Sequence, residues 1–169
     1  EMCIRDRFLT DECLKTFDTH FKMAPPLRTQ EDVDVLREAL ASGVVDMIAT
    51  DHAPHSAVDK IKEFDLADNG IIGLQSAAPL TFRLVKEGKL SLERWVESLT
   101  TSPARLLNLP KGTLQKGVDA DFILFNPDQK WKFTEAEICS KSKNSPFIDW
   151  EFEGKVKSTW VKGKKVYED

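Results

Sequence analysis

Residues 44–55 read Val44-Val45-Asp46-Met47-Ile48-Ala49-Thr50-Asp51-His52-Ala53-Pro54-His55. The stretch opens as a nearly unbroken apolar run, which is typical of a strand covered on both faces. A carboxylate and two imidazoles follow directly after that run. Parallel α/β proteins place ligand-binding groups in the loops that leave the carboxyl ends of their strands. We therefore predict a functional site at Asp51, His52 and His55.

Pro54 determines how the two histidines are presented. Because proline disfavours helix at the residue before it, we expect His52 and His55 to be spread along an extended loop. Ordinary structural roles compete with this interpretation, since aspartates often form turns and most histidines are hydrogen-bonded structural groups. The residues alone leave a metal or acid–base site and a structural loop as open alternatives.

The composition narrows the class of protein. With 169 residues and 41% hydrophobic content, the chain is long enough to bury a core, in one domain or two small ones. Its net charge is -4 and its lysines and arginines are scattered, which argues against a nucleic-acid partner. Its apolar runs are too short to cross a bilayer, and we find no signal-peptide pattern. Cys3, Cys13 and Cys139 are odd in number and widely spaced, which predicts free thiols in a reducing cytoplasm.

The sequence pattern of residues 10–50 predicts a partial βαβ unit. A helix is expected to begin after Thr10 and to run towards residue 21, and Pro25-Pro26 forces an extended segment over residues 22–27. A second helix is expected to begin at Thr29 and to end at Gly43, directly before the strand over residues 44–50. This order of elements is typical of an α/β fold.

A long polar segment follows the predicted site. Residues 56–70 carry many charges, among them Lys60, and are expected to form a functional or lid-like loop. Asn69-Gly70 is a strong turn signal, and Gly70 and Gly73 would allow backbone to approach a ligand closely. An ordinary solvated turn is the alternative at this place.

Helices and then strands are predicted for the rest of the chain. Helices are expected over residues 74–87, from Ser91 to about Leu99, and after Ser102-Pro103. Beyond a boundary near residues 111–114 the chain is rich in strand signals, with strands expected at 122–125, 156–161 and 165–167. Residues 144–147 predict a rigid loop. Too few strands are present to close a sandwich alone, so this region is expected to need others.

Several motifs occur in one order along the chain and carry a family resemblance. They are Phe8-Leu9-Thr10-Asp11-Glu12, Phe21-Lys22-Met23-Ala24-Pro25-Pro26-Leu27-Arg28, Thr50-Asp51-His52-Ala53-Pro54-His55, Asn69-Gly70-Ile71-Ile72-Gly73-Leu74, Thr101-Ser102-Pro103-Ala104, Gly117-Val118-Asp119-Ala120-Asp121 and Ser145-Pro146-Phe147. From Phe8 onwards the chain resembles the C-terminal part of the bacterial dihydroorotases, in the cyclic amidohydrolase branch of the amidohydrolase superfamily. Residues 1–7 do not share the resemblance and are interpreted as a foreign or misassembled end.

The resemblance implies an α/β fold. Residues 1–112 would be the C-terminal portion of a distorted (β/α)8 barrel, and residues 113–169 part of a small β-sandwich built from both chain ends. The barrel of this family carries a binuclear zinc site. Such enzymes reversibly cyclise N-carbamoyl-L-aspartate to (S)-dihydroorotate in pyrimidine synthesis.

Roles are carried over only where the motifs match. Asp51 matches the aspartate after the last barrel strand, which ligates one metal ion and handles the catalytic proton. His55 matches a contact to the substrate carboxylate, and Asn69 and Gly70 match backbone positions that hold the pyrimidine ring. Arg28 is interpreted as structural.

Two departures limit the inference. Of the metal ligands that the resemblance implies, only Asp51 is present, and a complete barrel takes about 250 residues. We therefore expect a truncated, inactive piece whose remaining zinc ligands lie outside it. In addition, Ala24 stands where many dihydroorotases have an asparagine that binds substrate, and alanine offers no side-chain hydrogen bond.

Two other functions remain open. One is a different cyclic amidohydrolase, of the allantoinase or hydantoinase type, since these share the Asp-His-Ala-Pro-His motif. The other is a noncatalytic dihydroorotase-like subunit that supports aspartate transcarbamoylase. A small-molecule substrate is expected in either enzymatic case, and the sequence allows both a homo-oligomer and a complex with aspartate transcarbamoylase.

Overall fold

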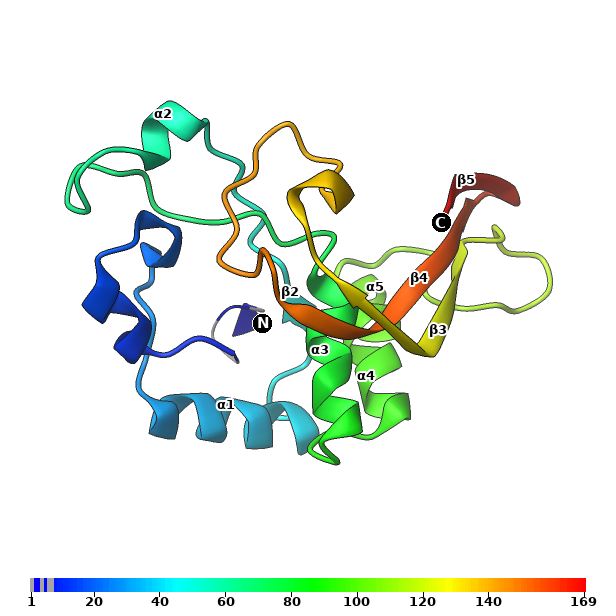
Figure 1. Ribbon diagram of the computed structural model, residues 1–169. Coiled ribbons are helices and arrows are strands. Elements are labelled where there is room, and N and C mark those ends of the chain that lie inside the picture. Colours follow the sequence, from blue (N-terminus) through cyan, green and yellow to red (C-terminus); the bar gives the residue numbers. More distant parts are fainter. Residues whose placement is uncertain (1, 4, 6–7) are drawn as a thin grey trace.

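The computed structural model describes residues 2–3, 5 and 8–169 (Figure 1). The helices are α1 (Gln30–Ala41), α2 (Ala57–Lys60), α3 (Ala77–Lys86), α4 (Leu92–Leu99) and α5 (Thr101–Leu106), with short 3-10 helices η2 (Asp11–Thr16), η3 (Thr19–Phe21) and η4 (Glu135–Glu137). The strands are β1 (Met2–Cys3), β2 (Ile48–Ala49), β3 (Phe122–Lys132), β4 (Glu151–Val161) and β5 (Lys164–Glu168).

The strands form two separate sheets. β1 and β2 pair in parallel through Met2 with Ile48 and Cys3 with Ala49. β3, β4 and β5 form an antiparallel sheet in that spatial order, and the β3–β4 register shifts at two places. Because bulges bend the strand that carries them, these shifts curve the sheet.

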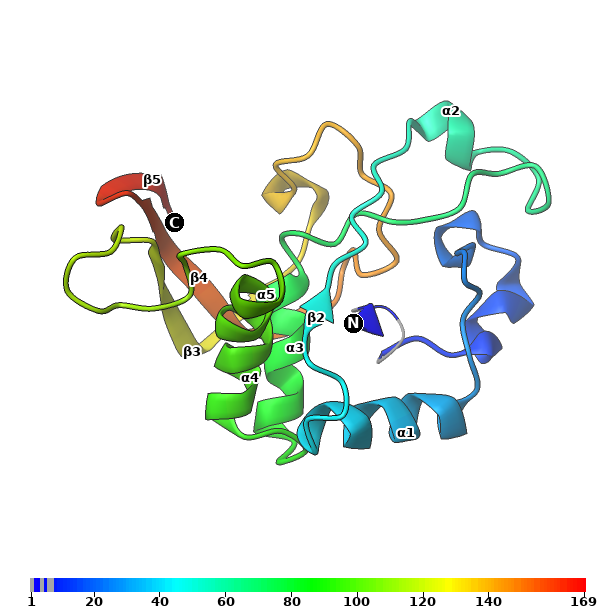
Figure 2. The ribbon, with the colours of Figure 1, turned by 180° about the vertical axis from the view of Figure 1, so that it is seen from behind.

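The sheet packs on the central helices through three aromatic rings. The ring centroids of Phe82 on α3 and Phe125 on β3 are 4.9 Å apart, and Trp95 on α4 lies 5.1 Å from Phe82 and 5.2 Å from Phe125. Gly154 on β4 makes room for them, since a Cβ there would lie 2.5 Å from the Phe125 ring. Figures 1 and 2 show α3 and α4 between this sheet and the N-terminal half of the chain.

One buried core runs through both halves of the chain. Arg94 on α4 strengthens their connection, because its guanidinium donates hydrogen bonds to the carbonyls of Leu40 at 2.9 Å and Asp46 at 3.1 Å. The core residues are Leu9, Met23, Leu27, Leu40, Ile48, Ile71, Ile72, Leu80, Phe82, Leu84, Leu90, Trp95, Phe133, Ile138, Phe147 and Phe152. The helices and β2 are thus held as one packed body.

Some predicted elements differ in length from those observed. The strand predicted over residues 44–50 is only Ile48–Ala49, because β1 pairs with two of its residues and Val44 is 78% exposed. The helix expected after Thr10 is two short 3-10 helices, separated by Phe17 with a positive φ. In contrast, the strand expected at residues 122–125 continues to Lys132, and α1 begins after the predicted N-cap Thr29.

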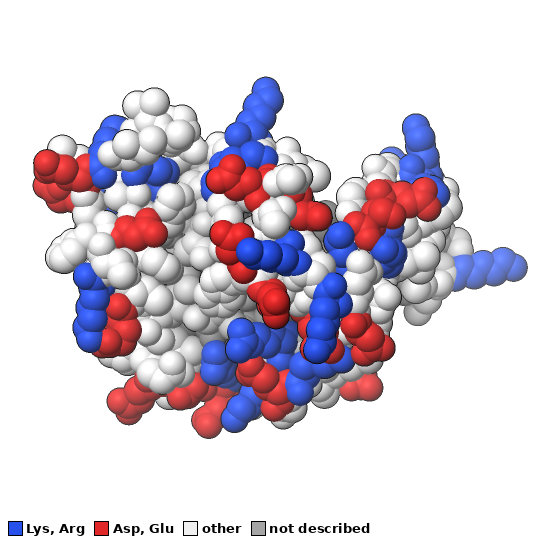
Figure 3. All heavy atoms as spheres, viewed as in Figure 1, with Lys and Arg blue, Asp and Glu red and all other residues white. Residues whose placement is uncertain are grey.

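The surface carries both signs of charge. On the face in Figure 3, acidic and basic side chains are interspersed and form no single large patch of one sign. None of the helices within residues 2–3, 5 and 8–169 is long and apolar enough to cross a membrane. Several apolar side chains of the small sheet are exposed, among them Ile123, Leu124 and Val166.

We predict that Phe82→Ala lowers the free energy of unfolding by about 3–5 kcal/mol, because it empties the centre of the aromatic cluster. Urea unfolding followed by tryptophan fluorescence measures this. Val58→Ala is the control, since Val58 is 73% exposed, and such a surface change stays within about 0.5 kcal/mol. Equal effects of the two substitutions would show that the cluster does not hold the sheet to the helices.

Candidate functional site

Asp51 lies at the carboxyl end of β2, as predicted. Its φ is 47°, a left-handed conformation that ends the strand and turns the chain. Its side chain is 46% exposed and forms an ion pair with the guanidinium of Arg5, which is only 2% exposed. Arg5 also donates a hydrogen bond to the carbonyl of Ala24 at 3.2 Å. The carboxylate is therefore held beside a buried positive charge.

The described residues do not fit a metal ion. Within residues 2–3, 5 and 8–169, no group of three or more His, Cys, Asp or Glu side chains could hold one. A zinc site needs about four ligands, and a guanidinium beside Asp51 opposes a second positive charge. Within residues 8–169, Asp51 is the residue that the resemblance assigns to a zinc centre.

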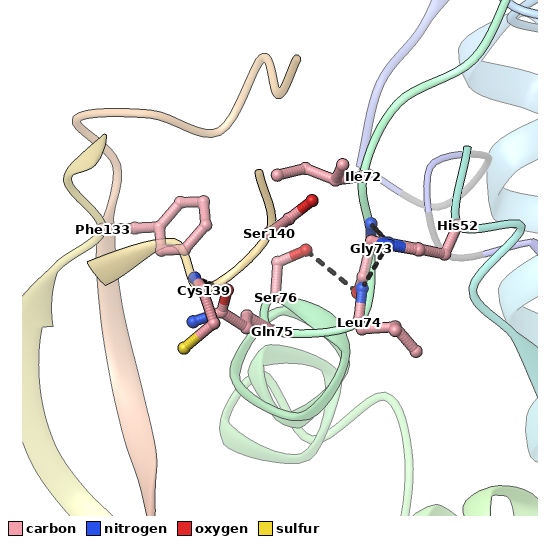
Figure 4. Close-up of a pocket in the computed structure, with 9 residues that line it drawn as sticks. All are labelled: His52, Ile72, Gly73, Leu74, Gln75, Ser76, Phe133, Cys139 and Ser140. Carbon is pink, nitrogen blue, oxygen red and sulfur yellow. Dashed lines mark hydrogen bonds between the residues drawn. The ribbon is translucent and has the colours of Figure 1, made fainter. Parts of the chain in front are cut away.

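His52 has a structural role. Its Nδ1 accepts hydrogen bonds from the backbone N–H groups of Gly73 at 3.1 Å and Leu74 at 3.4 Å, as Figure 4 shows. The imidazole therefore connects the loop after β2 to the start of the segment that leads into α3. A pocket of about 240 Å³ lies beside this contact, and its lining includes Phe133 and Cys139. These hydrogen bonds support the structural alternative for His52.

His55 and Gly70 are brought together. The Nδ1 atom of His55 lies 3.3 Å from a carboxylate oxygen of Asp68, which orients the imidazole. The Nε2 atom lies 3.6 Å from the position that a Cβ on Gly70 would take. Asn69, between Asp68 and Gly70, is exposed. Three of the predicted site residues, His55, Asn69 and Gly70, therefore share one corner of the structure, whereas Asp51 contacts Arg5.

Only glycine fits at position 70. Its φ is +110°, and a Cβ on Gly70 would lie 2.6 Å from the Cβ of Ala53. The N–H of Gly70 donates to the carbonyl of Lys22 at 2.9 Å. The glycine thus allows a close approach of the backbone to the loop that follows Asp51, whereas the approach predicted from the sequence was to a ligand.

Two residues that hold this corner were missed by the sequence analysis. Lys60 was counted among the charges of a polar loop, but it is 4% exposed, and its Nζ donates to the carbonyls of Asp68 at 2.9 Å and Gly70 at 3.2 Å. Burial lowers the pKa of its amino group, and the carboxylates of Asp18 and Asp68 act in the opposite direction. A short helix that turns Lys60 inwards is not visible in the pattern of charges.

Asn144 is the second missed residue. It is 4% exposed, and its Nδ2 donates to the carbonyls of Ala53 at 2.9 Å and Gly70 at 3.2 Å. Its Oδ1 accepts the backbone N–H of His55 at 3.2 Å. The available signals were its place in the predicted rigid loop over residues 144–147 and its position directly before Ser145-Pro146-Phe147, which is one of the family motifs.

A groove of about 750 Å³ lies beside this corner. Its walls come from three segments of the chain and include His55, Lys60 and Asn144. The other lining residues are Asp18, His20, Phe21, Ser56, Ala57, Ile61, Glu135, Lys141, Ser142, Lys143, Ser145, Pro146, Ile148 and Asp149. The groove is large enough for a small molecule, and it has polar groups of both charges.

Comparison with known proteins shows the family to which the chain belongs. The sequence profile of the amidohydrolase family matches residues 8–166, so the chain belongs to this family. The match begins at Phe8, where the resemblance was expected to begin. The relatives described next are named as dihydroorotases and hydantoinases.

Its curated relatives include dihydroorotases. The chain is 48% identical over 159 residues to the dihydroorotase of Syntrophotalea carbinolica, covering 94% of this chain and 37% of that protein. It is 45% identical over 161 residues to the dihydroorotase of Syntrophus aciditrophicus, covering 95% of this chain and 38% of that protein. The chain thus spans well under half the length of these relatives.

Solved structures of cyclic amidohydrolases share the fold. The L-hydantoinase (dihydropyrimidinase) from Arthrobacter aurescens matches with a TM-score of 0.92 and 34% identity, over 98% of this chain and 38% of its own. The dihydropyrimidinase from Brevibacillus agri NCHU1002 matches with a TM-score of 0.91 and 27% identity, over the same shares. These matches confirm the predicted fold class, the C-terminal part of an α/β hydrolase barrel with a small additional sheet.

We predict that Gly70→Ala destabilises the chain more than Gly43→Ala does. Both glycines have a positive φ, which costs alanine about 1–2 kcal/mol. At position 70 alone, the new methyl group would also collide with the side chain of Ala53. Overpacking of this kind lowers the free energy of unfolding by about 1–3 kcal/mol more. Urea unfolding of the two variants measures the difference. Identical losses would mean that the loops at residues 53 and 70 can move apart without cost.

Proposed function

We propose that the whole protein to which this chain belongs is a dihydroorotase, which interconverts N-carbamoyl-L-aspartate and (S)-dihydroorotate. The observation that carries the proposal is the 48% identity over 94% of this chain to a curated dihydroorotase. The solved hydantoinase structures share the fold at lower identity, 34% or less for those described above. With this function, the protein would act in pyrimidine biosynthesis in the cytoplasm.

In this proposal the predicted site residues keep their roles. Asp51 is the catalytic residue of this chain, and a carboxylate at this place can accept a proton during ring opening and return it to the amide nitrogen. Asp51 would also be a ligand of a binuclear zinc centre whose other ligands lie outside residues 8–169. Arg5, which pairs with Asp51 here, lies before residue 8, where the family match begins. Zinc supplies Lewis acidity when it is bound.

The substrate contacts come from the corner around Gly70. His55 binds the substrate carboxylate, and its contact with Asp68 sets the direction of its imidazole. The backbone at Asn69 and Gly70 holds the pyrimidine ring. We assign residues 1–112 to the barrel and residues 113–169 to the small sandwich, which other strands of the whole protein would complete. A homo-oligomer, or a complex with aspartate transcarbamoylase, remains compatible with this assignment.

A hydantoinase-type cyclic amidohydrolase is the second candidate. It is favoured by the TM-score of 0.92 to the L-hydantoinase of Arthrobacter aurescens, and Ala24 adds to it because alanine cannot make the substrate hydrogen bond expected of many dihydroorotases. Both candidates hydrolyse a cyclic amide, so the ring that is turned over distinguishes them.

A graft tests the proposed function. Residues 8–169 replace the aligned segment of the Syntrophotalea carbinolica dihydroorotase, and the zinc-loaded chimaera is assayed with dihydroorotate and hydantoin. We expect dihydroorotate turnover, and a fall in kcat of about 10²–10⁴ in Asp51→Asn, because its acid–base group is lost. Asp65→Asn, a change at an exposed position in the loop before Asn69, is the control and should leave turnover unchanged. Preference for hydantoin would support the second candidate, and full activity of Asp51→Asn would refute the role of Asp51.

A further inference from the structure

We propose that Lys60 and Asn144 are positioning residues, which together form a buried clamp on the carbonyl of Gly70 and thereby set the substrate-binding corner of the site. The proposal rests on the proposed function, because that function makes His55, Asn69 and Gly70 substrate contacts. Neither Lys60 nor Asn144 would touch the substrate. Their role would be to fix the distance between the loop that carries His55 and the loop that carries Gly70.

The clamp is centred on one oxygen atom. The carbonyl of Gly70 accepts a hydrogen bond from Nζ of Lys60 and another from Nδ2 of Asn144, each at 3.2 Å. Both donors belong to side chains that are 4% exposed. A carbonyl oxygen has two lone pairs, so these donors satisfy it fully and fix its direction.

Each donor also holds a second group on the neighbouring backbone. Lys60 also donates to the carbonyl of Asp68, so it binds the carbonyls of the residues directly before and after Asn69. Asn144 donates to the carbonyl of Ala53, and its Oδ1 accepts the N–H of His55. One amide group therefore connects the backbone at Ala53 and His55 with the backbone at Gly70.

The backbone of Asn144 is anchored independently of its side chain. Its carbonyl accepts the N–H of Ile72 at 3.0 Å, and Ile72 belongs to the buried core. The side chain amide is thus presented from a rigid support. Catalytic and binding groups need this kind of support, since a misplacement of about 1 Å can cost about 10²-fold in rate.

The lysine contributes more than a hydrogen bond. An ammonium group forms a stronger hydrogen bond than a neutral donor does, and its partners in this clamp are the buried carbonyl of Gly70 and the partly buried carbonyl of Asp68. Without the lysine, the carbonyl of Asp68 loses this donor and the carbonyl of Gly70 keeps only Asn144, which weakens the hold on the backbone around Asn69. Lys60→Met keeps the apolar stem of the side chain and removes all of its donors, so it isolates this contribution.

The first test measures amide hydrogen exchange by NMR in the 169-residue chain. We expect Asn144→Leu to accelerate exchange at His55 by at least about tenfold, because its acceptor is lost. We expect Asn144→Asp to leave His55 an acceptor but to loosen the loop at Gly70, because the carbonyl of Ala53 loses its donor and the carbonyl of Gly70 loses one of its two. Exchange of the Gly70 amide, which donates to the carbonyl of Lys22, should then accelerate. Lys60→Met should accelerate exchange at Gly70 with little effect at His55. Asn126→Asp, the same chemical change at an exposed position on β3, is the matched control.

The amides of α3 serve as an internal reference in the same spectra. Faster exchange confined to residues 53–72 supports the clamp. Equal acceleration in α3 would assign Lys60 and Asn144 to general stability and overturn the proposal. Unchanged exchange at both His55 and Gly70 would overturn it as well.

The second test uses the zinc-loaded chimaera. We expect Asn144→Asp and Lys60→Met to raise KM for dihydroorotate by about 10–100-fold, with a smaller effect on kcat, because the binding corner loses its geometry while Asp51 is unaffected. A fall in kcat with unchanged KM would contradict the positioning role. Absence of turnover in the unsubstituted chimaera would count against the proposed function alone, since the exchange measurement reports on the clamp without any substrate.

Discussion

The close approach of Gly70 to Ala53 is the constraint on which the site depends. Because position 70 has no side chain, the loop after β2 and the loop before α3 can lie against each other. The side-chain amide of Asn144 can then donate to the carbonyls of both Ala53 and Gly70, and the ammonium of Lys60 donates a second hydrogen bond to the carbonyl of Gly70. Any side chain at position 70 would separate these loops and leave several buried polar groups without partners.

Rigid elements hold this corner in place. α3 begins directly after the segment that binds His52, and it packs on the small sheet through Phe82. Arg94 on α4 binds carbonyls at the end of α1 and in the approach to β2. The strand that presents Asp51 is therefore supported by α4, and the loop that presents Gly70 continues into α3. The two sides of the site are thus fixed by neighbouring helices of one core.

The sequence was most informative where local signals are strong. The place of β2 and the N-caps at Thr29 and Ser91 could be predicted, because each follows from a local pattern. The need for glycine at position 70 was indicated by Asn69-Gly70, but its neighbour Ala53 was not. The length of β2 could not, because a strand extends only as far as its neighbours pair with it. Lys60 and Asn144 were missed for a similar reason, since their burial depends on contacts with residues far along the chain.

β5 lies at the edge of the small sheet, and all five of its residues are exposed. An edge strand with free backbone groups is a template onto which a strand of another molecule can add. Lys164 and Lys165 carry charge at this edge, and such charges oppose edge-to-edge addition. Acetylation of these lysines would therefore make the chain more prone to aggregate at high concentration, through intermolecular β-pairing along Val166 and its neighbours.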